Sequence, residues 1–226
     1  MQARFKPRGR RRLLKLALTI IIGLVLAYEL VVPAIISFTL VHYRRPVCCV
    51  TPADRGMATY EDVTITTADG MMLSGWYVPS HNRAAIIALH GSGGNRTAVL
   101  GHAAMLARHG YGVLLLDVRG HGNSGGQFTL GWDANLDIDA AIAYLRARPE
   151  VDPDRIGALG LSMGGEVAMQ AAAHTDKLKA VVSDGAGARS SWIVSAARSA
   201  SVAVVKVGLA APPAWWSLLP SKNRFG

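Results

Sequence analysis

The chain has 226 residues, half of them apolar, which is enough for one globular domain with a sizeable core. Its formal net charge is +9, but nine of the 24 Lys and Arg residues lie before residue 46. The remainder is nearly neutral, which excludes the basic folded surface expected of a nucleic-acid-binding domain.

Residues 16–40 are apolar except for Glu29, and a helix of this length crosses a hydrocarbon core of about 30 Å. Glu29 and Pro33 weaken its second half, so 13–28 is the strongest span. The excess of positive charge before it predicts a single-pass signal anchor with a cytoplasmic N-terminus and an extracytoplasmic body. A cleaved signal peptide is the alternative, and residues 10–15 also resemble a twin-arginine export signal.

Five segments follow from this pattern: a basic tail at 1–15, the anchor at 16–40, a juxtamembrane linker at 41–59, a globular core at 60–190, and a different C-terminal segment at 191–226. Cys48 and Cys49 are adjacent in the linker, a spacing that rarely permits an unstrained disulfide. We therefore expect no disulfide framework here, and acylation beside a membrane is an alternative role.

The core alternates between strand-like and helix-like patterns. Strands are predicted at 61–67, 72–78, 84–89, 112–116, 156–160 and 178–183, and helices at 95–109, 134–148 and 167–173. Asp69-Gly70 predicts a hairpin turn between the first two strands. The later alternation predicts an α/β fold with a mostly parallel sheet.

Residues 160–164 form a Gly-x-Ser-x-Gly motif between a buried strand and a helix. The backbone doubles back sharply at such a corner, so side chains at Gly160 and Gly164 would collide with the adjoining strand and helix. The motif thus predicts that the Ser162 hydroxyl is exposed above the edge of the sheet.

Four motifs, in this order along the chain, resemble those of the α/β-hydrolase superfamily. They are the Asp-Gly hairpin, the glycine-rich loop 90–94, the loop 117–124 and the serine corner 160–165. The resemblance covers about residues 60–190, and within the superfamily it is to membrane-anchored serine hydrolases of the serine aminopeptidase and lysophospholipase-like group. It implies helices on both faces of the sheet.

The resemblance implies that Ser162 is a catalytic nucleophile. The backbone N–H groups of Met163 and Ser92 would stabilise the oxyanion, and Asp184 occupies an acid position that a minority of these hydrolases use. An ordinary loop-capping role is the alternative for Asp184. The family pattern makes His90, Asp117, Arg119 and His121 structural.

An activated serine needs a histidine base, which in this fold follows the nucleophile in the sequence. The histidine after Ser162 is His174, placed within the helix that the corner begins. We therefore expect this chain to be an incomplete version of a longer enzyme. The last strands of the sheet would be missing from this chain. The resemblance implies that 191–226 is the start of a cap or lid, with an atypical C-terminal segment as the alternative. A helix is predicted at 196–209, and Trp215 and Trp216 could line an acyl pocket, rest on a membrane or simply pack.

The resulting hypothesis is a membrane-anchored serine hydrolase acting on small acyl esters or thioesters, lipids included, with no cofactor or metal. This chain itself would be inactive or impaired, because the triad histidine is missing. A serine peptidase of the same fold and a non-catalytic, membrane-tethered binding protein are the alternatives.

Overall fold

The computed structural model describes residues 8–42, 45–127, 129, 133–186 and 203–207. The chain divides into two compact units, Met1–Tyr43 and Arg44–Gly226. In the first unit, α1 (Arg8–His42) is one long helix, and 12–39 is long and apolar enough to cross a membrane.

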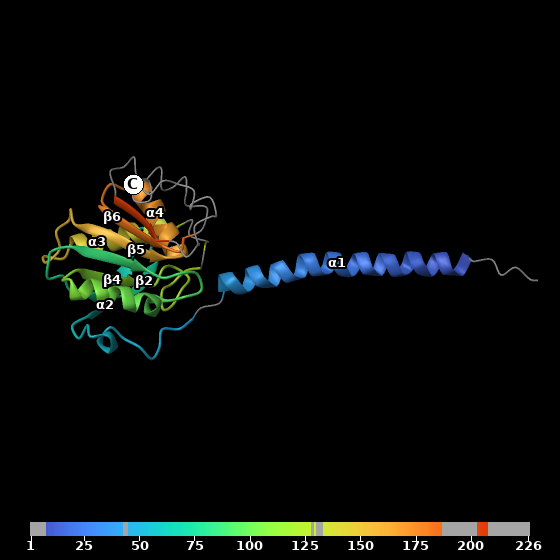
Figure 1. Cartoon of the computed structure of the whole chain (residues 1–226), viewed down its shortest axis with the longest axis horizontal. Coiled ribbons are helices and arrows are strands. Elements are labelled where there is room, and N and C mark those ends of the chain that lie inside the picture. Colours follow the sequence, from blue (N-terminus) through green and yellow to red (C-terminus); the bar gives the residue numbers. More distant parts are fainter. Residues whose placement is uncertain (1–7, 43–44, 128, 130–132, 187–202, 208–226) are drawn as a thin grey trace, which may run out of the picture. The chain divides into compact units, whose positions relative to one another are not determined.

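The second unit is built on a seven-stranded sheet in the order β1-β2-β4-β3-β5-β6-β7 (Figure 1). The strands are β1 (Glu61–Thr66), β2 (Met72–Val78), β3 (Ala85–Leu89), β4 (Gly112–Leu116), β5 (Ile156–Leu161), β6 (Ala180–Asp184) and β7 (Ala203–Val207). β1 pairs antiparallel with β2 and β2 antiparallel with β4, whereas all other pairings are parallel. This arrangement confirms the predicted α/β-hydrolase fold class and its N-terminal hairpin.

Successive side chains of the central strands enter two separate apolar clusters, because strand side chains alternate between faces. In β4, Leu114 and Leu116 belong to the cluster containing α3 (Ala134–Arg146) and α4 (Met163–His174). Val113 and Leu115 belong to the cluster containing α2 (Leu100–Arg108), which follows the 3-10 helix η2 (Arg96–Val99). The helices therefore cover both faces of the sheet, as predicted.

The helix predicted at 196–209 is wrong over 203–207, which form β7 beside β6. The sheet thus has one more strand than the sequence pattern indicated. Valine is β-branched and favours a pleated strand, and the parallel partner β6 supplies the pairing that decides between the two structures. The rest of the predicted helix, together with Trp215 and Trp216, lies outside the described residues.

The segment 45–60, most of which lies in the predicted juxtamembrane linker, packs against the body. Val47, Val50 and Tyr60 contact the cluster around α2, and Met57, after the 3-10 helix η1 (Ala53–Arg55), is 5% exposed within that cluster. Cys48 and Cys49 are joined in a disulfide, which corrects our expectation that adjacent cysteines would not pair. The pairing occurs with Cys49 at a positive φ of 72°, a backbone conformation that few non-glycine residues adopt.

Parallel strands β3, β4, β5 and β6 place the loops at their carboxyl ends on one edge of the sheet. These loops begin at His90, Asp117, Ser162 and Gly185 respectively. The candidate site is built at this edge.

Candidate active site

Ser162 occupies the sharp corner between β5 and α4. It is exposed, and its backbone has φ 48° and ψ −115°, a conformation that non-glycine residues rarely adopt. Its N–H donates to the Asp184 carbonyl over 2.7 Å, and its own carbonyl accepts from Gly165 N over 2.9 Å. These bonds hold the corner against a strain of about 1–3 kcal/mol.

The glycines around Ser162 are required by close packing. A Cβ at Gly164 would lie 2.6 Å from the Leu89 carbonyl oxygen and 2.7 Å from that of His90. A Cβ at Gly160 would collide with the backbone of Gly164, and one at Gly165 with the Ser183 hydroxyl. The collisions predicted for Gly160 and Gly164 are therefore present in the structure.

The loop that carries Ser92 lies beside this corner. A Cβ at Gly91 would be 3.5 Å from the Cβ of Ser162. Gly94 N donates to Gly91 O over 3.1 Å, so residues 91–94 form a tight turn, with Ser92 exposed and Gly93 at φ 66°. Met163 is the first residue of α4, where a backbone N–H has no intrahelical acceptor.

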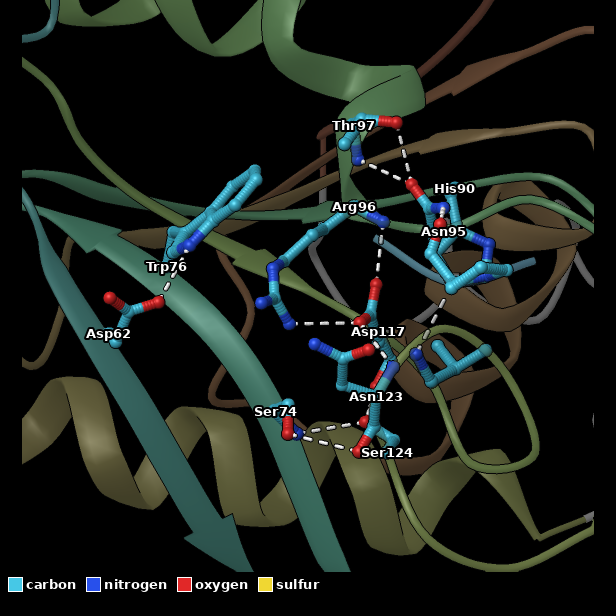
Figure 2. Close-up of polar contacts among 12 residues, drawn as sticks. Asp62, Ser74, Trp76, His90, Asn95, Arg96, Thr97, Asp117, Asn123 and Ser124 are labelled. Atoms are coloured by element: carbon cyan, nitrogen blue, oxygen red, sulfur yellow. Dashed lines mark hydrogen bonds and ion pairs between the residues drawn. The ribbon is translucent and has the colours of Figure 1, made fainter. Parts of the chain in front are cut away.

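Asp117 organises the neighbouring loops from a fully buried position (Figure 2). Its carboxylate accepts from Arg96 N over 2.6 Å, from Arg96 Nη1 over 2.9 Å and from Asn123 N over 3.0 Å. Burial raises the pKa of Asp117, while these hydrogen bonds and the Arg96 charge oppose that rise. The carboxylate is fully engaged within the protein, in agreement with the structural role expected of it.

Arg119 connects the hairpin turn to α3. Its guanidinium contacts Asp137 over 2.7 Å and Asp69 over 2.9 Å. Asp137 is fully buried, and the hydrogen bonds from Arg119 lower the pKa of the exposed Asp69 to about 2. Arg119 therefore braces its loop by ion pairing, as predicted.

His90 and His121 are buried, and backbone groups surround their ring nitrogens. His90 Nδ1 contacts Gly91 O over 2.8 Å, and its Nε2 accepts from Val118 N over 3.3 Å. His121 Nε2 accepts from Gly93 N over 3.2 Å. Burial lowers the pKa of His90 to about 4, which keeps the ring neutral at neutral pH. Both rings support loops, as predicted.

Asp184, the predicted acid, is the last residue of β6 and pairs with Leu161 of β5. Its carbonyl accepts the hydrogen bond from Ser162 N, so the two residues are neighbours. Its carboxylate is 3.8 Å from His102 Nε2, and both side chains are about one-third exposed. Sequence reasoning missed His102. The one available signal was that α2 starts at the same edge of the sheet, which places its first turn among these loops.

His174 is the last residue of α4, eleven positions beyond the start of that helix. At a rise of 1.5 Å per residue, about 16 Å of helix separates it from the corner. The structure therefore brings Ser162, the Ser92 loop and Asp184 together and leaves His174 apart. Within the described part of the chain, the Ser162 hydroxyl has no hydrogen-bonding partner.

Comparison with known proteins identifies related sequences. The profile of the family described as X-Pro dipeptidyl-peptidase (S15 family) matches residues 50–207. The uncharacterized protein YfhR of Salmonella typhi is 33% identical over 130 residues, which is 55% of this chain and 42% of that protein. The thiohydrolase aneE of Aspergillus aculeatus is 32% identical over 135 residues, 58% of this chain and 42% of that protein. The chain thus spans less than half the length of these relatives.

Solved structures also resemble the body. The esterase Pf2001 of Pyrococcus furiosus superimposes with a TM-score of 0.59 at 35% identity, covering 63% of this chain and 58% of that one. The α/β hydrolase GrgF of a Penicillium species gives a TM-score of 0.53 at 30% identity, covering 57% and 46% respectively.

Proposed function

Since the chain belongs to the X-Pro dipeptidyl-peptidase (S15) family and shares the α/β fold of known esterases, we propose that it is a serine hydrolase acting through Ser162. The proposal rests on one observation above all. An exposed serine occupies a strained corner that three closely packed glycines and the Asp184 carbonyl maintain. The proposed substrates are acyl esters or thioesters, and the thiohydrolase and esterase names of two related proteins support this class.

In the proposed reaction, the Ser162 oxygen attacks the acyl carbonyl carbon and forms a tetrahedral oxyanion. The N–H groups of Met163 and Ser92 would donate to that oxygen, each lowering the barrier by about 3–4 kcal/mol. Collapse of the intermediate expels the alcohol or thiol and leaves an acyl-serine, which water then hydrolyses. Asp184 is the proposed acid of the catalytic group.

Among the described residues, no histidine is hydrogen-bonded to the Ser162 hydroxyl, His102 beside Asp184 included. Both buried histidines near the site already contact backbone groups. Loss of a triad histidine alone reduces turnover on the order of 10⁶-fold. We therefore expect this chain alone to form an acyl-serine slowly.

A serine peptidase is the second candidate, and the family description favours it specifically. An Xaa-Pro p-nitroanilide and a p-nitrophenyl acyl ester separate the two, since only the peptidase releases product from the anilide. A non-catalytic protein that retains the corner is the third candidate, and the test described next addresses it.

The proposal predicts slow, Ser162-dependent labelling by a fluorophosphonate probe. Ser162→Ala should abolish labelling, whereas Ser92→Ala should retain it because the backbone N–H remains. Ser92→Pro should reduce the labelling rate on the order of 10²-fold. Ser92 precedes Gly93, whose positive φ is typical of the third position of a type II turn, and proline suits the position before it. Labelling of neither this chain nor a longer gene product would favour the non-catalytic protein.

α1 is the proposed membrane anchor of this hydrolase, with its N-terminus in the cytoplasm. Its length and composition permit a span, and the basic residues that precede 13–28 support this orientation.

A further inference from the structure

A pocket of about 310 Å³ lies on the body, away from Ser162. Three parts of the chain form its walls. They are residues 55–59 of the segment 45–60 (the docked segment), the end of β2 with the loop after it, and the last turns of α2. Val78 at the end of β2 pairs with Val113 near the start of the antiparallel β4. The pocket is therefore at the sheet edge opposite the one where β5 delivers Ser162.

Two arginines and a histidine are the ionisable side chains that the described residues contribute to this pocket. Arg55, His81 and Arg108 line it, and among the described residues no Asp or Glu does. Within the described chain, none of the three side chains has a hydrogen bond or an ion pair, and Arg55 has only an electrostatic interaction with its neighbour Asp54. The nearest acid in sequence, Asp54, accepts from Thr51 N over 2.7 Å and Thr51 Oγ1 over 2.8 Å and does not line the pocket.

An ordinary role explains part of this arrangement. Arg108 lies in the last turn of α2, where a cation compensates the negative end of the helix dipole. That role does not explain why Arg55 and His81, from two other parts of the chain, line the same hollow. Charges of one sign repel, so an anion placed between these exposed groups would be attracted by all of them.

The floor of the pocket is apolar. Met57, Val78 and Ala104 line it and are 5%, 6% and 6% exposed. Its volume is at the lower end of the range for small-ligand pockets, about 300–1,000 Å³. A ligand that fits therefore combines a compact anionic group with a short apolar portion.

We propose that this pocket binds a phosphate ester. Two guanidinium groups match phosphate oxygens, to which arginine donates two parallel hydrogen bonds. A phosphate monoester carries about −1.5 to −2 charges at pH 7, which balances two arginines. The alkyl or glycerol portion of the ester contacts Met57 and Val78. The ester is either a soluble metabolite or the headgroup of a phospholipid.

Calorimetric titration of the detergent-solubilised full chain with glycerol 3-phosphate tests the proposal. The double variant Arg55→Gln/Arg108→Gln should weaken binding at least tenfold. The matched double variant Arg83→Gln/Arg146→Gln removes the same charge from exposed positions outside the pocket and should bind as the parent does. Circular dichroism shows whether each variant is folded, and His81→Gln serves as a milder pocket variant.

The same titration with dihexanoyl phosphatidic acid tests whether the bound phosphate belongs to a lipid headgroup or to a soluble ester. Uncharged dihexanoylglycerol is the control that lacks the phosphate. Phosphatidic acid binding much more tightly than glycerol 3-phosphate supports a lipid headgroup, and equal affinities support a soluble ester. The proposal is wrong if neither phosphate compound binds, if dihexanoylglycerol binds as well as phosphatidic acid, or if the matched control loses binding equally. Ser162→Ala should leave phosphate binding unchanged, so this result is independent of the fluorophosphonate test.

Discussion

The glycines at the serine corner are needed for space and not for backbone freedom. Gly160, Gly164 and Gly165 all have negative φ, unlike Gly93 in the adjoining loop. An alanine could adopt these backbone angles, but its Cβ would meet backbone atoms of β3 and of the corner itself. Backbone atoms in a central sheet cannot move aside as a flexible side chain can.

Gly164→Ala should therefore destabilise the protein by about 3 kcal/mol, at the upper end of overpacking effects. Gly101→Ala is the matched control, because a Cβ at this exposed position of α2 meets nothing within 4 Å. It should stabilise the protein by up to about 1 kcal/mol through helix propensity. Urea unfolding curves measure both. Equal stability of the two variants would contradict the packing argument.

His90 makes stability depend on pH. Its folded pKa is about 4, below the ordinary value of 6.5, so between these values the unfolded state binds more protons. The free energy of unfolding is therefore highest above pH 6.5. It falls by about 3 kcal/mol as the pH drops through 4, because the folded protein takes up the proton on His90 less readily than the unfolded chain.

Unfolding free energies measured from pH 7 to pH 4 should show this loss. His90→Gln should be less stable at pH 7 but should have a smaller slope over the same range. His109→Gln, at an exposed position, serves as the control and should keep the parental slope. If the unfolding free energy of His90→Gln changed with pH as steeply as that of the parent, His90 would not be the cause of the pH dependence.

At the scale of elements, the segment after α1 is attached to the loop that carries Ser92. Asn95, 8% exposed, uses all of its hydrogen-bonding capacity. Its Oδ1 accepts from Thr97 N over 3.0 Å and from Thr97 Oγ1, while its Nδ2 donates to the carbonyls of Arg45 and Pro46 over 3.2 Å. One side chain therefore caps η2 and holds the docked segment.

Two substitutions separate these functions. Asn95→Ser keeps a neutral cap oxygen and loses both amide donors, so it should cost about 1–2 kcal/mol. Asn95→Ala loses the cap as well and should cost about 1 kcal/mol more. Thermal unfolding of the two variants beside the parent tests the prediction. Equal losses would show that only one of the two sets of bonds matters for stability.

Periodicity predicted most elements because their patterns are local. The strands from 61 to 183 and the three helices of the body were predicted to within a few residues. β7 was missed because an apolar run beside small residues fits either a helix or a strand, and pairing with β6 is a distant interaction. The docking of Arg45 on Asn95 joins residues 50 positions apart and leaves no local pattern.

At the scale of the whole molecule, topology made most of the candidate site predictable. Parallel strands bring the ends of β3, β5 and β6 to one edge, so Ser92, Ser162 and Asp184 could be grouped before any coordinates. The contact between His102 and Asp184 depends on side-chain directions at the start of α2, which no sequence pattern specifies. The roles assigned to these residues stay predictions until they are tested.

The proposed topology of the anchored protein predicts that protease added to intact cells digests the body. The basic residues before 13–28 should retain the N-terminus in the cytoplasm, where an N-terminal tag stays protected. Permeabilised cells provide the control, since tag and body should then both be digested. A body protected in intact cells would reverse the orientation proposed here.

At position 162, the residue that would give the most stable fold differs from the residue that the proposed reaction needs. Glycine adopts positive φ without steric penalty, so Ser162→Gly would release part of the strain that the corner now stores. Folding alone thus favours glycine at 162, and a lineage with no use for the hydroxyl would gain stability by discarding it. Under the proposed function, that lost stability is the cost of placing a nucleophile at this corner.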